Sequence, residues 1–324
     1  MFANRGRVFK KATDFPTNYY GEAKRRVQTR IAIELIGKYR QDHVLQAIKL
    51  PRSTFNYWKK QIMSEEKMTH LEKLIQTIFE ENDRNYGYRR IKLALVNMGY
   101  QINHKKIRRI MKKYNLVCIS FTRRSRRYRS YKGLVGTLAK NKVNRRFFST
   151  MPKQKIFTDI SEFHYTERNS EGIKLKRKAY LSPFLDGFNG EIIAYQFQQK
   201  PTLDCVLIPL KTAIKESKKT NFRTTIHSDQ GWHYQNQQYV RQLKQAKLYQ
   251  SMSRKGNCLD NALMENFFGL MKQEMYYGRS FSSFEELNRA VTNYIDYYNH
   301  HRIKAKLTGM SPVQYRIHTS RMTS

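Results

Sequence analysis

The hydrophobic pattern of this chain changes once, near Lys153, and that change limits the folds open to it. Before this point apolar residues recur at helical spacing, and after it come runs rich in Ile, Phe, Tyr and Thr that are bounded by turn residues. Helices and strands differ in period, at about 3.6 and 2 residues. We therefore expect a helical first part and a mixed α/β second part within the 324 residues.

The beginning of the chain has the pattern of a helix-turn-helix. A helix is expected over residues 23–40, where apolar residues are spaced for one helix face. A short helix over 42–49, a turn at Leu50-Pro51 and a second helix ending near Lys60 follow it. Any helical hairpin looks similar, so this pattern alone is a weak signal.

A second set of helices follows at once. We predict an amphipathic helix over 72–79, and then a helix with Ile91, Leu95 and Met98 on one face. Asn103 is a good N-cap for a third helix. The apolar stripe of that third helix consists of Ile107, Ile110, Met111 and Leu116.

These patterns predict four parts of the chain. Residues 1–62 form an N-terminal helical segment, and residues 65–118 form a second helix-turn-helix-like domain that binds DNA. Residues 119–150 are a basic linker without a hydrophobic period. Residues 151–318 form the α/β domain with a C-terminal helix.

The charge of the chain indicates a polyanionic partner. Lys and Arg number 62 against 25 Asp and Glu, which gives a net charge of +37. Residues 84–158 contain 22 Lys or Arg and no acidic residue. Such a one-signed stretch favours a nucleic acid as the partner. An acidic membrane surface would need an apolar face beside the charge, and none is visible.

The candidate DNA-contacting residues are basic side chains in four segments. They belong to the second helical set, to its last helix, to the linker and to a stretch over residues 254–272. They are Arg89, Arg90, Lys105, Lys106, Arg108, Arg109, Arg123, Arg124, Arg126, Arg127, Arg254, Lys255 and Lys272.

The second part predicts a sheet layered with helices. A first strand lies in KIFTDISEFHY, and two more are joined at Asp186-Gly187 or at Asn189-Gly190. A fourth strand lies in TTIHSDQG. Helices are expected over 203–216 and 235–246. They are followed by a long helix that is capped by Asn257 and has Asp260 in its first turn, and by a last helix with a capping box at Ser283 and Glu286.

Three carboxylates stand out by position. Asp159 lies inside the first predicted strand, Asp229 at the end of the fourth, and Glu265 in the middle of a helix. An acid within a strand costs solvation energy unless something neutralises it, and oxygen ligands suit Mg²⁺. Asp186 and Glu162 are rivals by composition, but Asp186 fits a turn and Glu162 points to the opposite face from Asp159.

The cysteines and the apolar runs exclude several classes of protein. Cys118, Cys205 and Cys258 are too scattered for a disulfide framework or a zinc clip. No run approaches the roughly 18 apolar residues of a membrane span, and the N-terminus has no apolar signal region. We expect a cytoplasmic protein that has no membrane partner.

The spacing of the three carboxylates resembles a known signature. There are 35 residues between Asp229 and Glu265, and Lys272 follows Glu265 by seven. This resembles the D,D(35)E signature of retroviral-integrase-like transposases. The surrounding motifs resemble the second-frame transposase of a large bacterial insertion-sequence family over nearly the whole chain. They include FTDISEF, HSDQGWHY and YYNHHRIKAKLTGMSPVQYR.

The resemblance implies a fold, a cofactor and partners. The fold would be RNase H-like, a mixed five-stranded sheet with flanking helices. Asp159, Asp229 and Glu265 would be the catalytic residues and would bind two Mg²⁺ ions, for which Mn²⁺ can substitute. The partners would be the element's terminal repeats and target DNA, bound by a homo-oligomer in the bacterial nucleoid, together with a possible upstream-frame product.

Two features depart from the relatives named by this resemblance. The His-His-Cys-Cys zinc domain of retroviral integrases has no counterpart here. The upstream leucine zipper of frameshift-fused transposases has none either, because the chain contains no heptad repeat. Recognition of the element ends by this chain acting alone is therefore open.

The chemistry implied is Mg²⁺-dependent cleavage and strand transfer. Two ions about 3.5 to 4 Å apart can activate a water and then a 3′-OH for in-line attack on a phosphodiester. A structure-specific nuclease of the same fold would hydrolyse without joining, and a non-catalytic DNA-binding regulator would need no triad. A tyrosine recombinase is a further rival, since the chain has 22 tyrosines.

Overall fold

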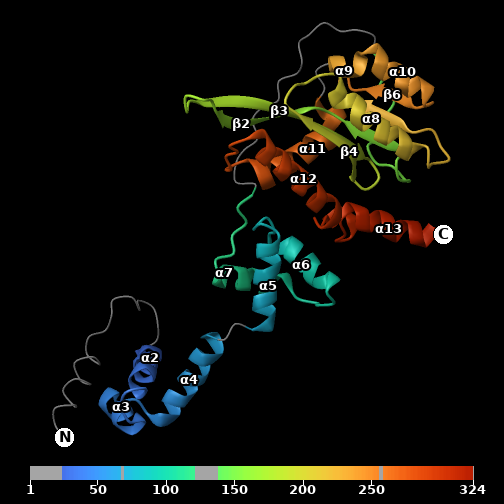
Figure 1. Ribbon diagram of the computed structural model, residues 1–324. Helices are drawn as coiled ribbons and strands as arrows, with labels where there is room; N and C mark the ends of the chain where they lie inside the picture. The colour runs from blue at the N-terminus through green and yellow to red at the C-terminus, as the bar shows by residue number, and fades with distance from the viewer. Residues whose placement is uncertain (1–23, 67–68, 121–137, 255–257, 324) are drawn as a thin grey trace. The chain divides into compact units, whose positions relative to one another are not determined.

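The computed structural model describes residues 24–66, 69–120, 138–254 and 258–323 (Figure 1). The chain divides into two compact units, Met1–Gln76 and Thr77–Ser324. Most of the predicted basic linker and the predicted cap Asn257 lie outside the described residues.

The first unit contains the expected short helix, turn and second helix. Its helices are α2 (Lys24–Ile36), α3 (Gln41–Ile48) and α4 (Arg52–Glu66). The turn between α3 and α4 is made by Lys49 in the left-handed region, with φ 53°. Helix α4 continues well beyond the predicted end near Lys60. The three helices enclose a small core of Ala32, Leu35, Val44, Leu45, Ile48, Leu50 and Phe55.

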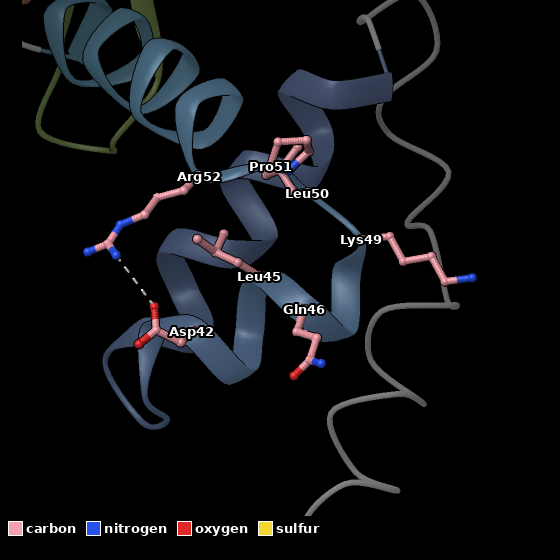
Figure 2. A pocket seen from close by; sticks show the side chains of 7 residues that line it. All are labelled: Asp42, Leu45, Gln46, Lys49, Leu50, Pro51 and Arg52. Atoms are coloured by element: carbon pink, nitrogen blue, oxygen red, sulfur yellow. Dashed lines mark ion pairs between the residues drawn. The ribbon is translucent and has the colours of Figure 1, made fainter.

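A shallow hollow of about 410 Å³ lies at the turn between α3 and α4 (Figure 2). An exposed ion pair between Arg52 and Asp42, 3.9 Å from nitrogen to oxygen, lies at its edge. The remaining lining residues are Leu45, Gln46, Lys49, Leu50 and Pro51. Because the hollow contains no group of chemically reactive side chains, we assign it no catalytic role.

The second helical set comprises α5 (His70–Glu81), α6 (Tyr88–Asn97) and α7 (His104–Lys113). The Asn103 side chain accepts a hydrogen bond of 2.8 Å from the Lys105 amide, which confirms the predicted cap. One expectation was wrong, because α6 ends at Asn97 and Met98 is left exposed beyond its last turn. The buried face consists of Ile75, Ile78, Phe79, Ile91, Leu95, Ile107, Ile110 and Met111.

The sheet of the second unit is five strands wide, as expected. Strands β1 and β2 both pair with β3 in one antiparallel register. Ile156 is opposite Asp186 and Ser161 is opposite Leu181, so a step of five residues forward along β1 and β2 matches a step of five residues back along β3. They are two halves of one strand. The strands are β1 (Lys155–Thr158), β2 (Ser161–Arg168), β3 (Lys174–Asp186), β4 (Ile192–Gln198), β5 (Thr225–Ser228) and β6 (Tyr249–Met252). Side by side, the order is β4, β3, the strand made of β1 and β2, β5 and β6.

The interruption between β1 and β2 falls at Asp159 and Ile160, so Asp159 directly follows β1 and lies between the two halves of this strand. The Gly187 amide donates to the Lys155 carbonyl at 2.8 Å. In this register the backbone N–H and C=O groups of the odd-numbered residues of β3 point toward β1. In this register the residue opposite Asp159 is Pro183. Proline has no N–H to donate to a ladder. The antiparallel ladder thus loses a donor at the position of Asp159.

The predicted hairpin between β3 and β4 is confirmed. Asp186 ends β3, and its carboxylate accepts hydrogen bonds from the amides of Phe188 at 2.9 Å and Lys153 at 2.8 Å. Gly190 has φ 74°, a conformation that glycine adopts without strain. Burial raises the pKa of Asp186 to about 6. Asp186 is therefore a turn residue, as its position in the sequence suggested.

Helices cover both faces of the sheet (Figure 1). On one face Phe184 and Ile226 pack with α8 (Asp204–Ser217) and α10 (Gln237–Gln245), beside the short α9 (Trp232–Gln235). On the other face Phe157 and Phe163 pack with α11 (Ala262–Met271) and α12 (Phe284–His300). Successive side chains of β1 point to opposite faces of the sheet, so this strand contributes side chains to both cores.

The helix that carries Glu265 is shorter than predicted. A 3-10 turn, η2 (Cys258–Asn261), precedes α11, and a π-helical turn, η3 (Lys272–Tyr276), follows it. Glu265 therefore lies in the first turn of α11 and not in the middle of a long helix. Asp260 lies in η2, ahead of the helix, and is buried.

The end of the chain differs from expectation in one respect. The Ser283 hydroxyl accepts a 3.1 Å hydrogen bond from the Glu286 amide, so half of the predicted capping box is confirmed. The Glu286 carboxylate bonds to Ser282 instead of Ser283. Helix α12 is not the last, because α13 (Pro312–Thr323) follows a short 3-10 turn, η4 (Ala305–Leu307). No helix in the described parts of the chain is long and apolar enough to cross a membrane.

A buried ion pair lies at η3, the turn that follows α11. The Glu274 carboxylate in η3 accepts two hydrogen bonds from Arg302, of 2.7 and 2.6 Å, and one of 2.9 Å from the Tyr294 hydroxyl. The Glu274 and Arg302 side chains are 0% and 2% exposed. Arg90 of α6 adds a second cation, with its Nη1 atom 3.3 Å from the Glu274 carboxylate.

Candidate active site

Asp159 and Asp229 emerge side by side because of how two strands pair. Strands β1 and β5 are parallel, and their partners differ by 70 residues throughout, from Lys155 with Thr225 to Phe157 with His227. Asp159 and Asp229 continue this offset one residue beyond each strand. Neighbouring strands lie about 4.8 Å apart. The two carboxylates therefore leave the same edge of the sheet as neighbours.

Each aspartate is oriented by hydrogen bonds. The Asp159 carboxylate accepts from the Ile160 amide at 2.8 Å and from Asn261 Nδ2 at 3.1 Å. The Asp229 carboxylate accepts from the Gly231 amide at 2.9 Å. A Cβ atom on Gly231 would come within 3.0 Å of Asp229 Oδ1, so a larger residue there would crowd this carboxylate.

The electrostatics of the site favour a bound cation. Burial and the charge of Asp229 raise the pKa of Asp159 well above its usual range, and the charge of Glu265 raises it further. Lys272 acts in the opposite direction. Burial also raises the pKa of Asp229. Two carboxylates held close together and partly desolvated repel each other when both are ionised, and a cation removes that repulsion.

Glu265 stands apart from the aspartate pair. Its side chain is exposed in the first turn of α11, although its charge reaches Asp159. Within the described ranges, no three His, Cys, Asp or Glu side chains form a group that could hold a metal ion. The structure thus brings two of the three predicted residues together and leaves the third to one side.

The residues at this edge fit a hard divalent cation. Mg²⁺ takes oxygen ligands, commonly one or two carboxylates with waters and substrate phosphate, so the aspartate pair is a sufficient protein contribution. The Oδ1 atom of Asn261 is buried beside them and has no hydrogen-bond partner among the described residues. The site therefore offers the cation oxygen atoms only.

Two buried side chains support the site and were missed in the sequence. Tyr234 lies beside the aspartates, where burial and then the charges of Asp159 and Asp229 raise its pKa. His227 bridges the Ser251 hydroxyl at 2.8 Å and the Asp260 carbonyl at 3.0 Å. The motif HSDQGWHY contains both residues, but no periodicity shows that they face inward.

Arg254 is paired within the protein. Its Nε and Nη2 atoms donate to Asp260 at 2.9 and 3.0 Å, and Arg145 adds a bond of 3.2 Å to the same carboxylate. The Arg254 side chain nevertheless remains 52% exposed. Asp260 was expected to act on a helix dipole, and it instead clamps the turn before α11 to two arginines.

Lys272 lies beside Asp159, half-buried. Its Nζ donates to the Glu162 carbonyl at 3.0 Å and lies 4.8 Å from the centre of the Phe163 ring. Burial lowers the pKa of Lys272, while the charges of Glu162 and Asp159 raise it. The rival Glu162 carboxylate is bound elsewhere, by Lys178 at 3.0 Å and His164 at 3.1 Å.

The predicted DNA-contacting residues of the helical set fall into two groups. Arg89 and Arg108 lie over the ring of Tyr88 with distances of 5.8 and 5.4 Å to its centre. Arg90 is different, because it bonds to Glu274 and to the Asn85 carbonyl and is only 23% exposed. In this structure Arg90 is therefore engaged within the protein itself. The members of the set on α7 are all exposed, and they are Lys105, Lys106, Arg108 and Arg109.

The other candidates lie outside the described residues. They are Lys255 and the four linker arginines Arg123, Arg124, Arg126 and Arg127.

Models of known protein families match the chain in three places. An HTH-like domain matches residues 66–126, and integrase core domains match residues 149–258 and 265–319. Together the two core matches contain all three carboxylates and every strand of the sheet.

Curated relatives cover most of the chain. The putative transposase InsK of insertion sequence element IS150 from Escherichia coli K12 is 42% identical over 88% of this chain and 96% of its own length. A transposase-like protein of Haemophilus influenzae is 45% identical over 67% of this chain and 94% of its own length. This chain belongs to the family of insertion-sequence transposases with an integrase core domain.

Among solved structures, the catalytic core of HTLV-2 integrase in complex with magnesium gives a TM-score of 0.37 at 14% identity. The matched region covers 52% of this chain and 99% of the integrase core chain. The second unit, a mixed sheet with helices on both faces, contains the integrase core matches and has the α/β architecture that the sequence predicted.

Proposed function

We propose that this transposase cleaves DNA at the ends of its insertion sequence and joins the freed 3′ ends to target DNA, with Mg²⁺ bound by Asp159 and Asp229. The observation that carries the proposal is the shared offset of β1 and β5, which aligns two partly desolvated carboxylates at one edge of the sheet. Glu265 is the third catalytic residue, approaching from the first turn of α11 when DNA and cation are bound.

The chain's own side chains hold the reacting groups in place. Asp159 and Asp229 would hold the cation, whose chemistry when bound is to activate an oxygen nucleophile and stabilise the leaving 3′ oxygen. Lys272 offsets the repulsion between these acids and the DNA phosphates. Tyr234 fills the space beside the pair and excludes water from that side.

The test is a cleavage and joining assay. The protein is incubated with labelled DNA that carries candidate element ends, with Mg²⁺ and with EDTA. We expect nicked and joined products only with Mg²⁺. Nicking without joining would favour the nuclease of the same fold, and DNA binding without either product would favour the regulator.

The exposed basic face of α7 is proposed to bind duplex phosphates. Replacing Lys105, Lys106, Arg108 and Arg109 together by glutamine should lower the slope of log K against log salt by up to about 3.6, at about 0.9 for each phosphate that is no longer neutralised. Fluorescence anisotropy between low and moderate salt measures this slope. A slope equal to that of the unsubstituted protein would mean that α7 is only a solvated face.

The linker arginines are proposed to add further phosphate contacts and base stacking, as their sequence indicates. We also propose that the protein acts as a homo-oligomer on DNA, because joining two element ends to one target requires two active sites. Analytical ultracentrifugation with end DNA measures the number of protomers bound.

Lys272 should matter for element ends more than for DNA in general. We expect Lys272→Ala to weaken end cleavage and Lys272→Glu to weaken it more, because a like charge is placed beside Asp159. Because Lys272 contacts the Glu162 carbonyl and the Phe163 ring, both variants should also lose some stability. The measurements are end cleavage, nonspecific DNA affinity and Tm. Near-normal cleavage by folded Lys272→Glu would show that this lysine has no part in the site.

A further inference from the structure

Asn261 occupies the N-cap position of α11 but does not cap it. An asparagine at this position normally accepts a hydrogen bond from an amide of the first helical turn. Here the side chain makes no such bond. Its Nδ2 atom instead donates to Asp159 Oδ2 at 3.1 Å. The side chain is directed to the aspartate pair at the expense of its usual local partner.

The other end of the same amide is unsatisfied. Asn261 is 5% exposed, and its Oδ1 is buried without a hydrogen-bond partner in the described part of the chain. Because Nδ2 donates to the Asp159 carboxylate, Oδ1 is the atom of this amide that is left without a partner among the described residues. A buried acceptor without a donor costs free energy, so such atoms in folded proteins mark bound water, ions or ligands.

The residue before Asn261, Asp260, is fixed by several contacts, and it thereby fixes the backbone at Asn261. Asp260 is clamped by Arg254 and Arg145, and its carbonyl accepts from His227 Nε2 at 3.0 Å. Four residues later, one helical turn on, comes Glu265. Asn261 is therefore a direct link between Asp159, at the end of β1, and the helix that carries the third carboxylate.

We propose that Asn261 is a positioning residue of the active site, which orients the Asp159 carboxylate through Nδ2 and presents Oδ1 to a divalent cation held by Asp159 and Asp229. This inference rests on the proposed function, because it assumes that the aspartate pair binds the cation. The hydrogen bond and the unsatisfied oxygen belong to one rigid amide, so a single side chain performs both tasks.

The test compares Asn261→Ala and Asn261→Leu with the unsubstituted protein. Leucine keeps the branching of asparagine at Cγ and removes both polar atoms, and alanine removes them without adding bulk, so the pair of variants separates the amide chemistry from packing. Because no capping bond is lost, both variants should fold. The matched control is Asn266→Ala, since Asn266 is an exposed asparagine on the same helix.

Two measurements are made on the full chain. Calorimetric titration with Mn²⁺ in the absence of DNA should give affinities about tenfold weaker for both Asn261 variants, the usual effect of losing a residue that orients a metal ligand. Cleavage of end DNA should fall at low Mg²⁺ and recover substantially as Mg²⁺ is raised. Asn266→Ala should equal the unsubstituted protein in both measurements.

The outcomes separate this inference from the proposed function. If the unsubstituted protein binds Mn²⁺ and cleaves DNA while both Asn261 variants bind Mn²⁺ equally well, the inference is overturned and the function stands. Cleavage that stays low at every Mg²⁺ concentration, or variants that do not fold, would assign Asn261 a structural role and also overturn it. If the unsubstituted protein binds no divalent cation, the proposed function fails, and the inference fails with it.

Discussion

Asp159→Asn, Asp229→Asn and Glu265→Gln are each expected to reduce DNA cleavage to background while leaving DNA affinity unchanged. The amides keep the shape of the side chains but are poor ligands for a hard cation, and the DNA is held by basic residues elsewhere. Single-turnover cleavage and anisotropy measure the two properties. Substantial Mg²⁺-dependent cleavage by any one variant would remove that residue from the site.

Glu162→Gln is the matched control for these three substitutions. Glu162 lies on β2 three residues after Asp159, and its carboxylate is bound by Lys178 and His164. Lys272 contacts the Glu162 carbonyl, which the substitution retains. We therefore expect cleavage close to that of the unsubstituted protein. A loss as large as that of Asp159→Asn would mean that the wrong carboxylate on this strand has been assigned.

Asp229→Asn should also raise the Tm of the metal-free protein by a few degrees. Burial raises the pKa of Asp229 in the folded state, so its contribution to stability is present at low pH and is lost as pH rises through that pKa. The gain from the neutral amide should accordingly grow with pH. Asp159→Asn should gain less, because one amide oxygen cannot replace both oxygens that accept from Ile160 and Asn261. Scanning calorimetry at several pH values measures these differences.

The largest loss of stability is expected for Glu274→Gln, at about 3 to 5 kcal/mol in the free energy of unfolding. The substitution leaves the Arg302 guanidinium buried without its counter-charge, and it weakens the bonds from Tyr294 and Arg90. Urea denaturation followed by circular dichroism measures the change. A loss below about 1 kcal/mol would show that water reaches this pair.

The double variant Glu274→Leu with Arg302→Met tests the cause of that loss. Replacing both members of a buried pair by apolar residues is often neutral, whereas removing one member leaves an uncompensated charge. The double variant should therefore be more stable than Glu274→Gln. If it is equally unstable, packing around η3 matters more than the ion pair.

Elements with a strong local signal could be predicted from the sequence. The hairpin after Asp186, the cap at Asn103 and the helix over 203–216 each depend on nearby residues, and each is confirmed. Helix α13 had such a signal, which was overlooked. Pro312 is its first residue, and Ser311 and Gln314 form a reciprocal capping pair with bonds of 3.4 and 3.0 Å.

The parts that were wrong or missed depend on partners distant in sequence. Strand β6 has only four residues and forms by parallel pairing with β5, which no local pattern shows. Asp159 was expected inside a strand and lies at an interruption between its two halves, opposite Pro183 of the next strand, which no local pattern shows. The role of Asn261 was invisible for the same reason, since its partner Asp159 lies 102 residues away.

The parallel pairing of β1 and β5 has a consequence for which insertions and deletions the chain can tolerate. The aspartates are aligned by the pairing of two four-residue strands, so the chain between them, with its hairpin and α8, can change length at its surface loops without moving either carboxylate. Adding or removing one residue within either strand would instead displace one aspartate and turn core side chains such as Ile226 toward the opposite face. Natural variation in length should therefore gather at loops such as residues 199–203 and 218–224 and be absent from the two strands themselves.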